Sequence, residues 1–155
     1  MIASLDTTPF KQGAPHPVVA VKSCAHRRKQ VLGDTVKLTQ FGVNCVELAS
    51  GVSSSLRHWH SHEDEFVLVL KGPLHLILDD TETELIEGDY VGFVANVPIG
   101  HKLVNRSDQT AVYLEVGSRR PKVDTVTYSH QNLLLQPNGT GTRSFVQRNG
   151  NGYEA

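Results

Sequence analysis

The sequence predicts an all-β fold, a sandwich or closed barrel rather than a series of βαβ units. From about Phe41 to Tyr128, short runs rich in Val, Leu, Ile and Phe are separated by Gly, Pro, Asn and Asp. No apolar stripe in this region has the 3.6-residue period of a helix over a helical length. The close and regular spacing of the runs suits a sandwich or a closed barrel.

Nine runs are expected to form strands. In order they are 41–48 (FGVNCVEL), 54–59 (SSLRHW), 65–70 (EFVLVL), 74–79 (LHLILD), 83–86 (TELI), 90–95 (YVGFVA), 101–105 (HKLVN), 111–116 (AVYLEV) and 124–128 (DTVTY).

The runs at 65–70 and 74–79 are predicted to form a hairpin, because Lys-Gly-Pro at 71–73 supplies turn residues between them. In the first run, Val67 and Val69 point to one face, and the alternate residues on the other face are also apolar. Because a lone barrel would expose that outer face to water, something must cover it. We expect a homodimer to do so, with the chain's own tails as the alternative.

The chain of 155 residues is the length of one domain. Residues 41–128 are predicted to form the barrel and residues 1–40 an extended N-terminal arm. The arm contains Pro9, Pro15, Pro17 and a basic group at 26–29, which we interpret as a solvated turn.

Residues 129–155 are predicted to form a C-terminal tail that packs on the barrel. The part from Gln136 onward is rich in Gly and Asn. Phe145, Val146 and Tyr153 are the side chains available to anchor it.

Charge and composition exclude several classes of protein. The net charge of −1 gives no field that would collect nucleic acid or anionic membrane. No segment approaches the roughly 20 apolar residues of a membrane span, and the first residues lack the pattern of a secretory signal. We therefore expect a soluble, cytoplasmic protein in which Cys24 and Cys45 are free thiols.

A cluster of histidines is the most informative feature of the sequence. Three of the eight histidines lie within residues 58–62, and Glu63, Asp64 and Glu65 follow. In a strand, His58 and His60 point to the same face and can present two imidazoles to one metal ion. Imidazole suits zinc, iron, nickel, copper or manganese. The alternative for such a pair in isolation is a solvated polar loop.

Two more residues extend this pattern. Glu65 has the parity of Val67 and Val69, so its carboxylate faces the interior if those valines do. Because a buried charge is costly unless it is paired, Glu65 is a candidate ligand. A remaining ligand should come from a strand across the barrel, and His101 opens the run at 101–105.

Two segments resemble the conserved motifs of the cupin superfamily. Residues 51–72 match the first motif at His58, His60, Glu65 and Gly72, and residues 88–105 match the second at Gly88, Asp89, His101 and Asn105. The resemblance covers about 41–116. It implies a single-domain cupin, a jelly-roll barrel also called a double-stranded β-helix. It also implies one divalent metal ion per chain (Zn, Fe, Mn or Ni) on His58, His60, Glu65 and His101.

Three residues are candidates for catalysis. His62 shares the parity of His58 and His60, but the motif spacing to Glu65 favours His60 as ligand. His62 then has a role at the rim of the site or in substrate contact, or is simply exposed. Glu115 is a general acid or base if it faces inward, and otherwise an outer-face partner of Arg106, Lys102 or Arg119. Tyr113 shares the face of Glu115.

A metal with these ligands is a Lewis acid for a small carbonyl, enol or carboxylate compound. The first hypothesis is therefore a metal-dependent lyase, dehydratase or isomerase. The second is an iron- or nickel-dependent dioxygenase, and the third is a non-catalytic binding or sensor module. The apolar residues Val67, Val69 and Leu103, and the lack of a Gly-rich phosphate loop, argue against a nucleotide or phosphosugar as substrate.

Overall fold

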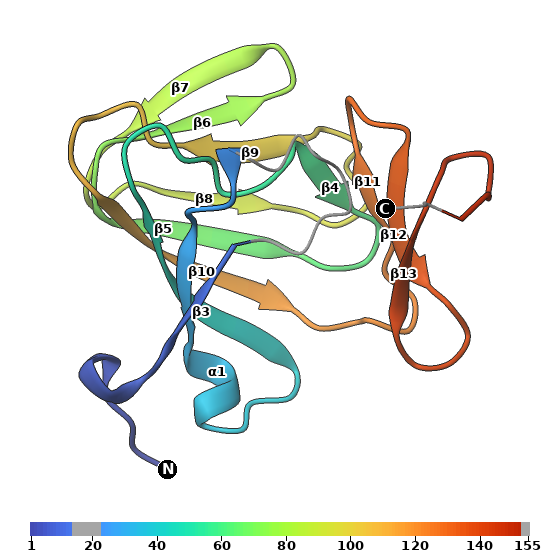
Figure 1. Cartoon of the computed structure of the whole chain (residues 1–155), viewed down its shortest axis with the longest axis horizontal. Helices are drawn as coiled ribbons and strands as arrows, with labels where there is room; N and C mark the ends of the chain where they lie inside the picture. Colours follow the sequence, from blue (N-terminus) through green and yellow to red (C-terminus); the bar gives the residue numbers. More distant parts are fainter. Residues whose placement is uncertain (14–22, 153–155) are drawn as a thin grey trace.

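The computed structural model describes residues 1–13 and 23–152, which form two antiparallel β-sheets (Figure 1). The first sheet has the strand order β1-β2-β3-β10-β5-β8, and the second has the order β13-β12-β11-β4-β9-β6-β7. This arrangement confirms the all-β, jelly-roll prediction. Pro15, Pro17 and Tyr153 of the predicted arms lie outside the described residues.

Each predicted run contains or overlaps a strand, but β4 overlaps its run only at His58 and Trp59, and β1, β2, β12 and β13 lie outside the predicted runs. The elements are η1 (Leu5–Thr7), β1 (Phe10–Gln12), β2 (Arg28–Val31), α1 (Leu32–Thr35), β3 (Phe41–Leu48), β4 (His58–His60), β5 (Glu65–Lys71), β6 (Leu74–Leu78), β7 (Thr81–Leu85), β8 (Tyr90–Phe93), β9 (His101–Val104), β10 (Ala111–Ser118), β11 (Val126–Tyr128), β12 (Leu133–Pro137) and β13 (Arg143–Val146).

The main core lies between the two sheets. Val46, Tyr113 and Val69 stand side by side across β3, β10 and β5 and are almost completely buried. Leu74 and Leu76 of β6 contribute to the same cluster from the second sheet. Alternation along β3, β5, β6 and β10 therefore sends side chains of both sheets into this core, while Val126, Tyr128 and Leu133 form a second, smaller cluster.

The predicted hairpin of 65–70 with 74–79 was wrong. Strand β5 pairs with β10 and β8 in the first sheet, whereas β6 pairs with β7 and β9 in the second. The turn at 71–73 thus carries the chain from one sheet to the other. Turn residues indicate a change of direction, but they do not decide which strand becomes the hydrogen-bonded neighbour.

Both ends of the chain add strands to these sheets. Strands β1 and β2 extend the first sheet beyond β3, and β11, β12 and β13 extend the second beyond β4. The basic group at 26–29 is not a solvated turn as predicted. Arg27 is buried, and β2 starts at Arg28 and pairs with β3.

The outer face of β5 is apolar and open to solvent. Val67 and Val69 are buried as predicted, while Phe66 and Leu70 remain exposed, and the Phe66 ring stacks with that of Tyr90. Cys24 and Cys45 are buried free thiols, as expected. In the part of the chain that the structure describes, no helix has the length and apolar character needed to cross a bilayer.

Candidate metal centre

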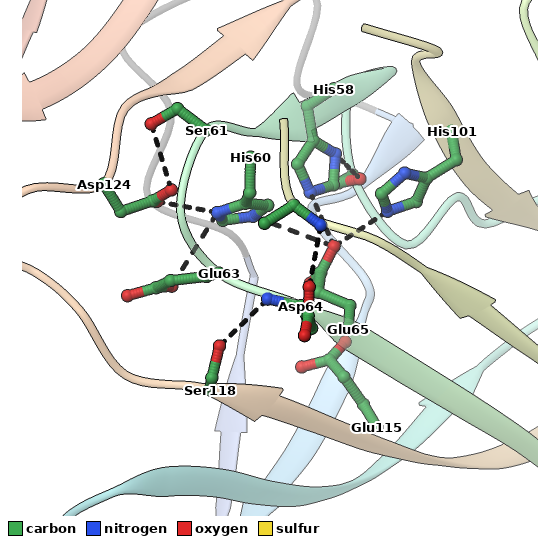
Figure 2. A network of polar contacts seen from close by, with 12 residues as sticks. His58, His60, Ser61, Glu63, Asp64, Glu65, His101, Glu115, Ser118 and Asp124 are labelled. Atoms are coloured by element: carbon green, nitrogen blue, oxygen red, sulfur yellow. Dashed lines mark hydrogen bonds and ion pairs between the residues drawn. The ribbon is translucent and has the colours of Figure 1, made fainter. Parts of the chain in front are cut away.

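Four side chains from three strands meet between the sheets (Figure 2). His58 and His60 occupy one face of β4, and His58 stands in register with His101 of β9. Glu65, the first residue of β5, reaches them from the opposite sheet. The His101 ring stacks on Phe93 with ring centroids 3.6 Å apart, which fixes the plane of this imidazole.

The three imidazoles share one carboxylate oxygen as their common neighbour. The Nε2 atoms of His58 and His60 each lie 3.7 Å from Glu65 Oε2, and His101 Nε2 lies 2.8 Å from it. Atoms that bind one ion at about 2.0–2.2 Å lie roughly 3–3.5 Å apart. The distances found here lie within about half an ångström of that range, so His58, His60 and Glu65 form a group that could hold a metal ion, with His101 beside it.

The far nitrogens of two histidines are held by fixed acceptors. His58 Nδ1 donates to the carbonyl oxygen of Leu56 at 2.9 Å, and His60 Nδ1 donates to Asp124 Oδ2 at 2.7 Å. Because a carbonyl or carboxylate can only accept, each proton resides on Nδ1. The Nε2 atoms of both rings face Glu65, and in the neutral Nδ1–H tautomer they are the atoms available to a metal ion.

Burial and charge set the ionisation of the cluster. Burial lowers the pKa of His58 to about 3, so this imidazole is neutral at physiological pH. Burial alone would raise the pKa of Glu65, but the hydrogen bond with His101 and the neighbouring histidines hold it well below its ordinary value. For His60, burial alone would lower the pKa, but the hydrogen bond to Asp124 and the charges of the neighbouring carboxylates together raise it.

The donor set fits a divalent metal ion. His58, His60 and Glu65 each offer one ligand atom, and these atoms lie within 4.8 Å of one another. Imidazole nitrogen together with carboxylate oxygen is a common environment for zinc, iron, manganese and nickel. The chemistry of the residues does not select one of these metals.

A second group of polar residues supports His60 from behind. Asp124 is fully buried, and its Oδ1 accepts from the backbone N–H of His62 at 2.9 Å. Arg143 of β13 lies 3.2 Å from Asp124 Oδ2 and 4.0 Å from Glu63 Oε2. His60, Glu63 and Asp124 could also gather around a cation, but the guanidinium of Arg143 already supplies positive charge there.

A cavity of about 470 Å³ opens beside the histidines. Its apolar wall includes Val67, Leu103, Val126, Leu135 and Phe145, and its polar lining includes Arg27, Lys29, Ser54, Ser55, Glu115 and Arg143. The apolar wall predicted from Val67 and Leu103 is present, but it covers only part of the cavity. The sequence argued against a phosphosugar because the wall was expected to be apolar. Arg27, Lys29 and Arg143 in the lining make the cavity compatible with a phosphorylated substrate.

Glu115 faces this cavity rather than the outer surface. It stands in register with Asn44 of β3 and Val67 of β5. Its Oε2 accepts from Arg27 Nη2 at 2.8 Å and its Oε1 accepts from Asn44 Nδ2 at 2.9 Å. Neither of these partners was among those considered from the sequence.

The alternative partners of Glu115 are engaged elsewhere. Arg106 forms two hydrogen bonds with Glu82, and Arg119 pairs with Asp34. The outer-face alternative for Glu115 therefore finds no support in the described contacts.

The remaining two candidates differ in position. Tyr113 lines the cavity and is completely buried, and burial raises the pKa of its phenol. His62 is exposed and does not line the cavity. Its placement agrees with the alternative of simple exposure, and its catalytic role stays a prediction.

Comparisons with known proteins agree with this geometry. A family model for the cupin domain matches residues 44–117. A solved structure of a sugar phosphate isomerase from a cupin superfamily, from Silicibacter pomeroyi, is 36% identical, with a TM-score of 0.91 over 100% of this chain and 98% of that chain. A candidate sugar phosphate isomerase from Acidithiobacillus ferrooxidans is 26% identical, with a TM-score of 0.80 over 99% of this chain and 96% of that chain.

A more distant match shares the fold alone. The polyketide cyclase RemF from Streptomyces resistomycificus is 21% identical, with a TM-score of 0.59 over 78% of this chain and 82% of that chain. No curated protein matches the chain.

Proposed function

This chain belongs to the cupin superfamily, and we propose that it is a metal-dependent isomerase that acts on a phosphorylated sugar. One observation carries the proposal: the three histidines and Glu65 converge beside a cavity that also contains an inward carboxylate and basic side chains. The resemblance to the sugar phosphate isomerase from Silicibacter pomeroyi supports the choice of substrate class.

We assign His58, His60, Glu65 and His101 as the ligands of one divalent ion. An imidazole binds a metal ion in its neutral form and a carboxylate contributes one negative charge, so a divalent ion on these ligands would keep a net positive charge. When bound, such an ion supplies Lewis-acid chemistry, which polarises a substrate carbonyl and makes the neighbouring C–H more acidic.

Isomerisation of an aldose to a ketose moves a proton between adjacent carbons, so the site must contain a base. Glu115 is suited to this role because it faces the cavity and its two oxygens are oriented by Arg27 and Asn44. In the proposed reaction, its carboxylate removes the proton from the carbon next to the carbonyl. It then returns that proton to the former carbonyl carbon, while the hydroxyl proton passes to the carbonyl oxygen.

The buried phenol of Tyr113 lies two residues before Glu115 in β10, on the same face of the strand. Because its pKa is raised by burial, it stays protonated and has a hydroxyl hydrogen to donate. We assign it to the substrate oxygens as a hydrogen-bond donor. The surrounding apolar wall limits the access of water to the reacting carbons.

The predicted homodimer is retained as a proposal. Phe66, Leu70 and Tyr90 expose apolar surface on the outer face of the first sheet. Burying these side chains against a second copy would remove them from water.

The proposed reaction can be tested on the full-length protein. The protein would be incubated without oxygen with a panel of aldose and ketose phosphates, and interconversion followed by NMR. We expect conversion of at least one pair, loss of conversion with a chelator, and recovery on addition of a divalent metal. Conversion of none, or substrate-dependent oxygen uptake in a parallel aerobic assay, would contradict the isomerase and, in the second case, favour a dioxygenase.

A further inference from the structure

Two basic side chains line the cavity from the sheet that faces the histidines. Lys29 of β2 stands in register with Val46 of β3, and Val46 in turn with Tyr113 of β10. Neighbours in register point to the same face of a sheet, so Lys29 faces inward like Tyr113. Arg27, two residues earlier, lines the same cavity.

Arg27 and Lys29 carry two positive charges, and among the described residues one carboxylate, that of Glu115, forms an ion pair with Arg27. Arg27 donates to Glu115 through Nη2, but its buried Nε has no hydrogen-bond partner among residues 1–13 and 23–152. For the Lys29 ammonium no hydrogen bond or ion pair is found within residues 1–13 and 23–152, although the more distant carboxylates of Glu115 and Asp34 also act on its charge. Burial and the nearby Arg27 charge lower the pKa of Lys29, so an anion placed there would be stabilising.

The third basic side chain of the cavity is already neutralised. Arg143 contacts the carboxylates of Asp124 and Glu63. Because these two carboxylates neutralise the Arg143 guanidinium, it would bind an anionic ligand more weakly than Arg27 or Lys29.

We propose that Arg27 and Lys29 bind the phosphate of the substrate, while its carbonyl end lies at the histidines and Glu65. The inference rests on the proposed function and adds the position and the residues of the phosphate subsite. Three strand spacings, roughly 14 Å along the sheet, separate the backbone of β2 from that of β5, which carries Glu65. Lys29 and Glu65 thus line one cavity from widely separated strands, and the subsite proposed for the phosphate is its β2 side.

The direct test measures binding of inorganic phosphate to the metal-loaded full-length protein by isothermal titration calorimetry. We expect Lys29→Gln to weaken phosphate binding roughly tenfold or more, because one charge-assisted hydrogen bond is lost. Lys29→Arg should keep most of the affinity, since it restores the charge. Circular dichroism would verify that each variant is folded.

Arg28→Gln is the matched control. Arg28 is the next residue of the same strand and carries the same charge, but it pairs with Glu47 at 3.1 Å and lies over the Phe10 ring. The Arg28→Gln protein should bind phosphate with the same affinity as the unmodified protein. The subsite would be overturned if Lys29→Gln bound phosphate as tightly as the unmodified protein, or if Lys29→Gln and Arg28→Gln lost the same affinity. Absence of phosphate binding by the unmodified protein would also overturn it.

The outcome is separable from that of the isomerase test. If no sugar phosphate is converted but Lys29→Gln selectively loses phosphate binding, the subsite holds and the isomerase does not. If conversion occurs, Lys29→Gln should raise KM more than it lowers kcat, as expected for a group that binds away from the reacting carbons. An unchanged KM would contradict the subsite and leave the isomerase intact.

Discussion

The buried carboxylate of Asp124 offers a sharp test of how the metal ligands are held. Asp124→Asn preserves the size of the side chain but replaces one oxygen by an NH₂ group. In one orientation that group faces His60 Nδ1 and Arg143, and in the other it faces the backbone N–H of His62. Either way, a donor is set against a donor inside a fully buried site.

The expected effects follow from these contacts. Loss of the carboxylate behind a ligating histidine typically lowers metal affinity about 10- to 100-fold, because it frees the ring and its Nδ1 proton. Leaving buried donors unsatisfied should also lower the free energy of unfolding by about 1–3 kcal/mol.

Metal affinity would be measured by titrating Mn²⁺ and Zn²⁺ against a competing chelator, and stability by urea unfolding. Glu82→Gln is the matched control, since Glu82 forms a similar pair with His75 Nδ1 at 2.9 Å, away from the metal cluster. It should leave metal affinity unchanged. Unaltered affinity in Asp124→Asn would refute the reasoning that Asp124 positions His60.

Further predictions concern catalysis, assembly and the core. Glu115→Gln should retain metal but lower kcat at least about 100-fold, as expected on loss of a general base; an unchanged kcat in steady-state assays would return Glu115 to a structural role. Phe66→Glu should shift a dimer to a monomer in light scattering after gel filtration, whereas a monomeric unmodified protein would contradict the homodimer. Leu74→Ala removes a fully buried side chain of the main core and should cost about 2–5 kcal/mol in urea unfolding. A cost below about 1 kcal/mol would mean that the site repacks.

Local geometry accounts for part of what sequence reasoning found at the site, whereas His101 was named from the motif resemblance and Glu115 from its place in an apolar run. Alternation in a strand is enough to place His58 and His60 on one face, and to give Glu65 the parity of Val67 and Val69. All five residues lie within a short stretch of chain. No long-range pairing needs to be known to place His58 with His60 on one face of β4, or Glu65 with Val67 and Val69 on one face of β5.

The parts that were missed depend on long-range pairing. Asp124 lies 64 residues from His60, and Arg27 lies 88 residues from Glu115. A single charged residue beside an apolar run looks the same whether it is exposed or buried against a partner. The hairpin prediction was wrong for the same reason. Strand β5 pairs with β10 and β8, and these pairings depend on the arrangement of all the strands in the sheet.

The central claim is that His58, His60, Glu65 and His101 hold one metal ion, and elemental analysis tests it most directly. The protein would be purified without a histidine tag or added metal, beside His58→Ala, His60→Ala and His62→Ala. We expect close to one divalent ion per chain in the unmodified protein and in His62→Ala, and almost none in the other two. Full metal content in His58→Ala or His60→Ala, or no metal in the unmodified protein, would contradict it.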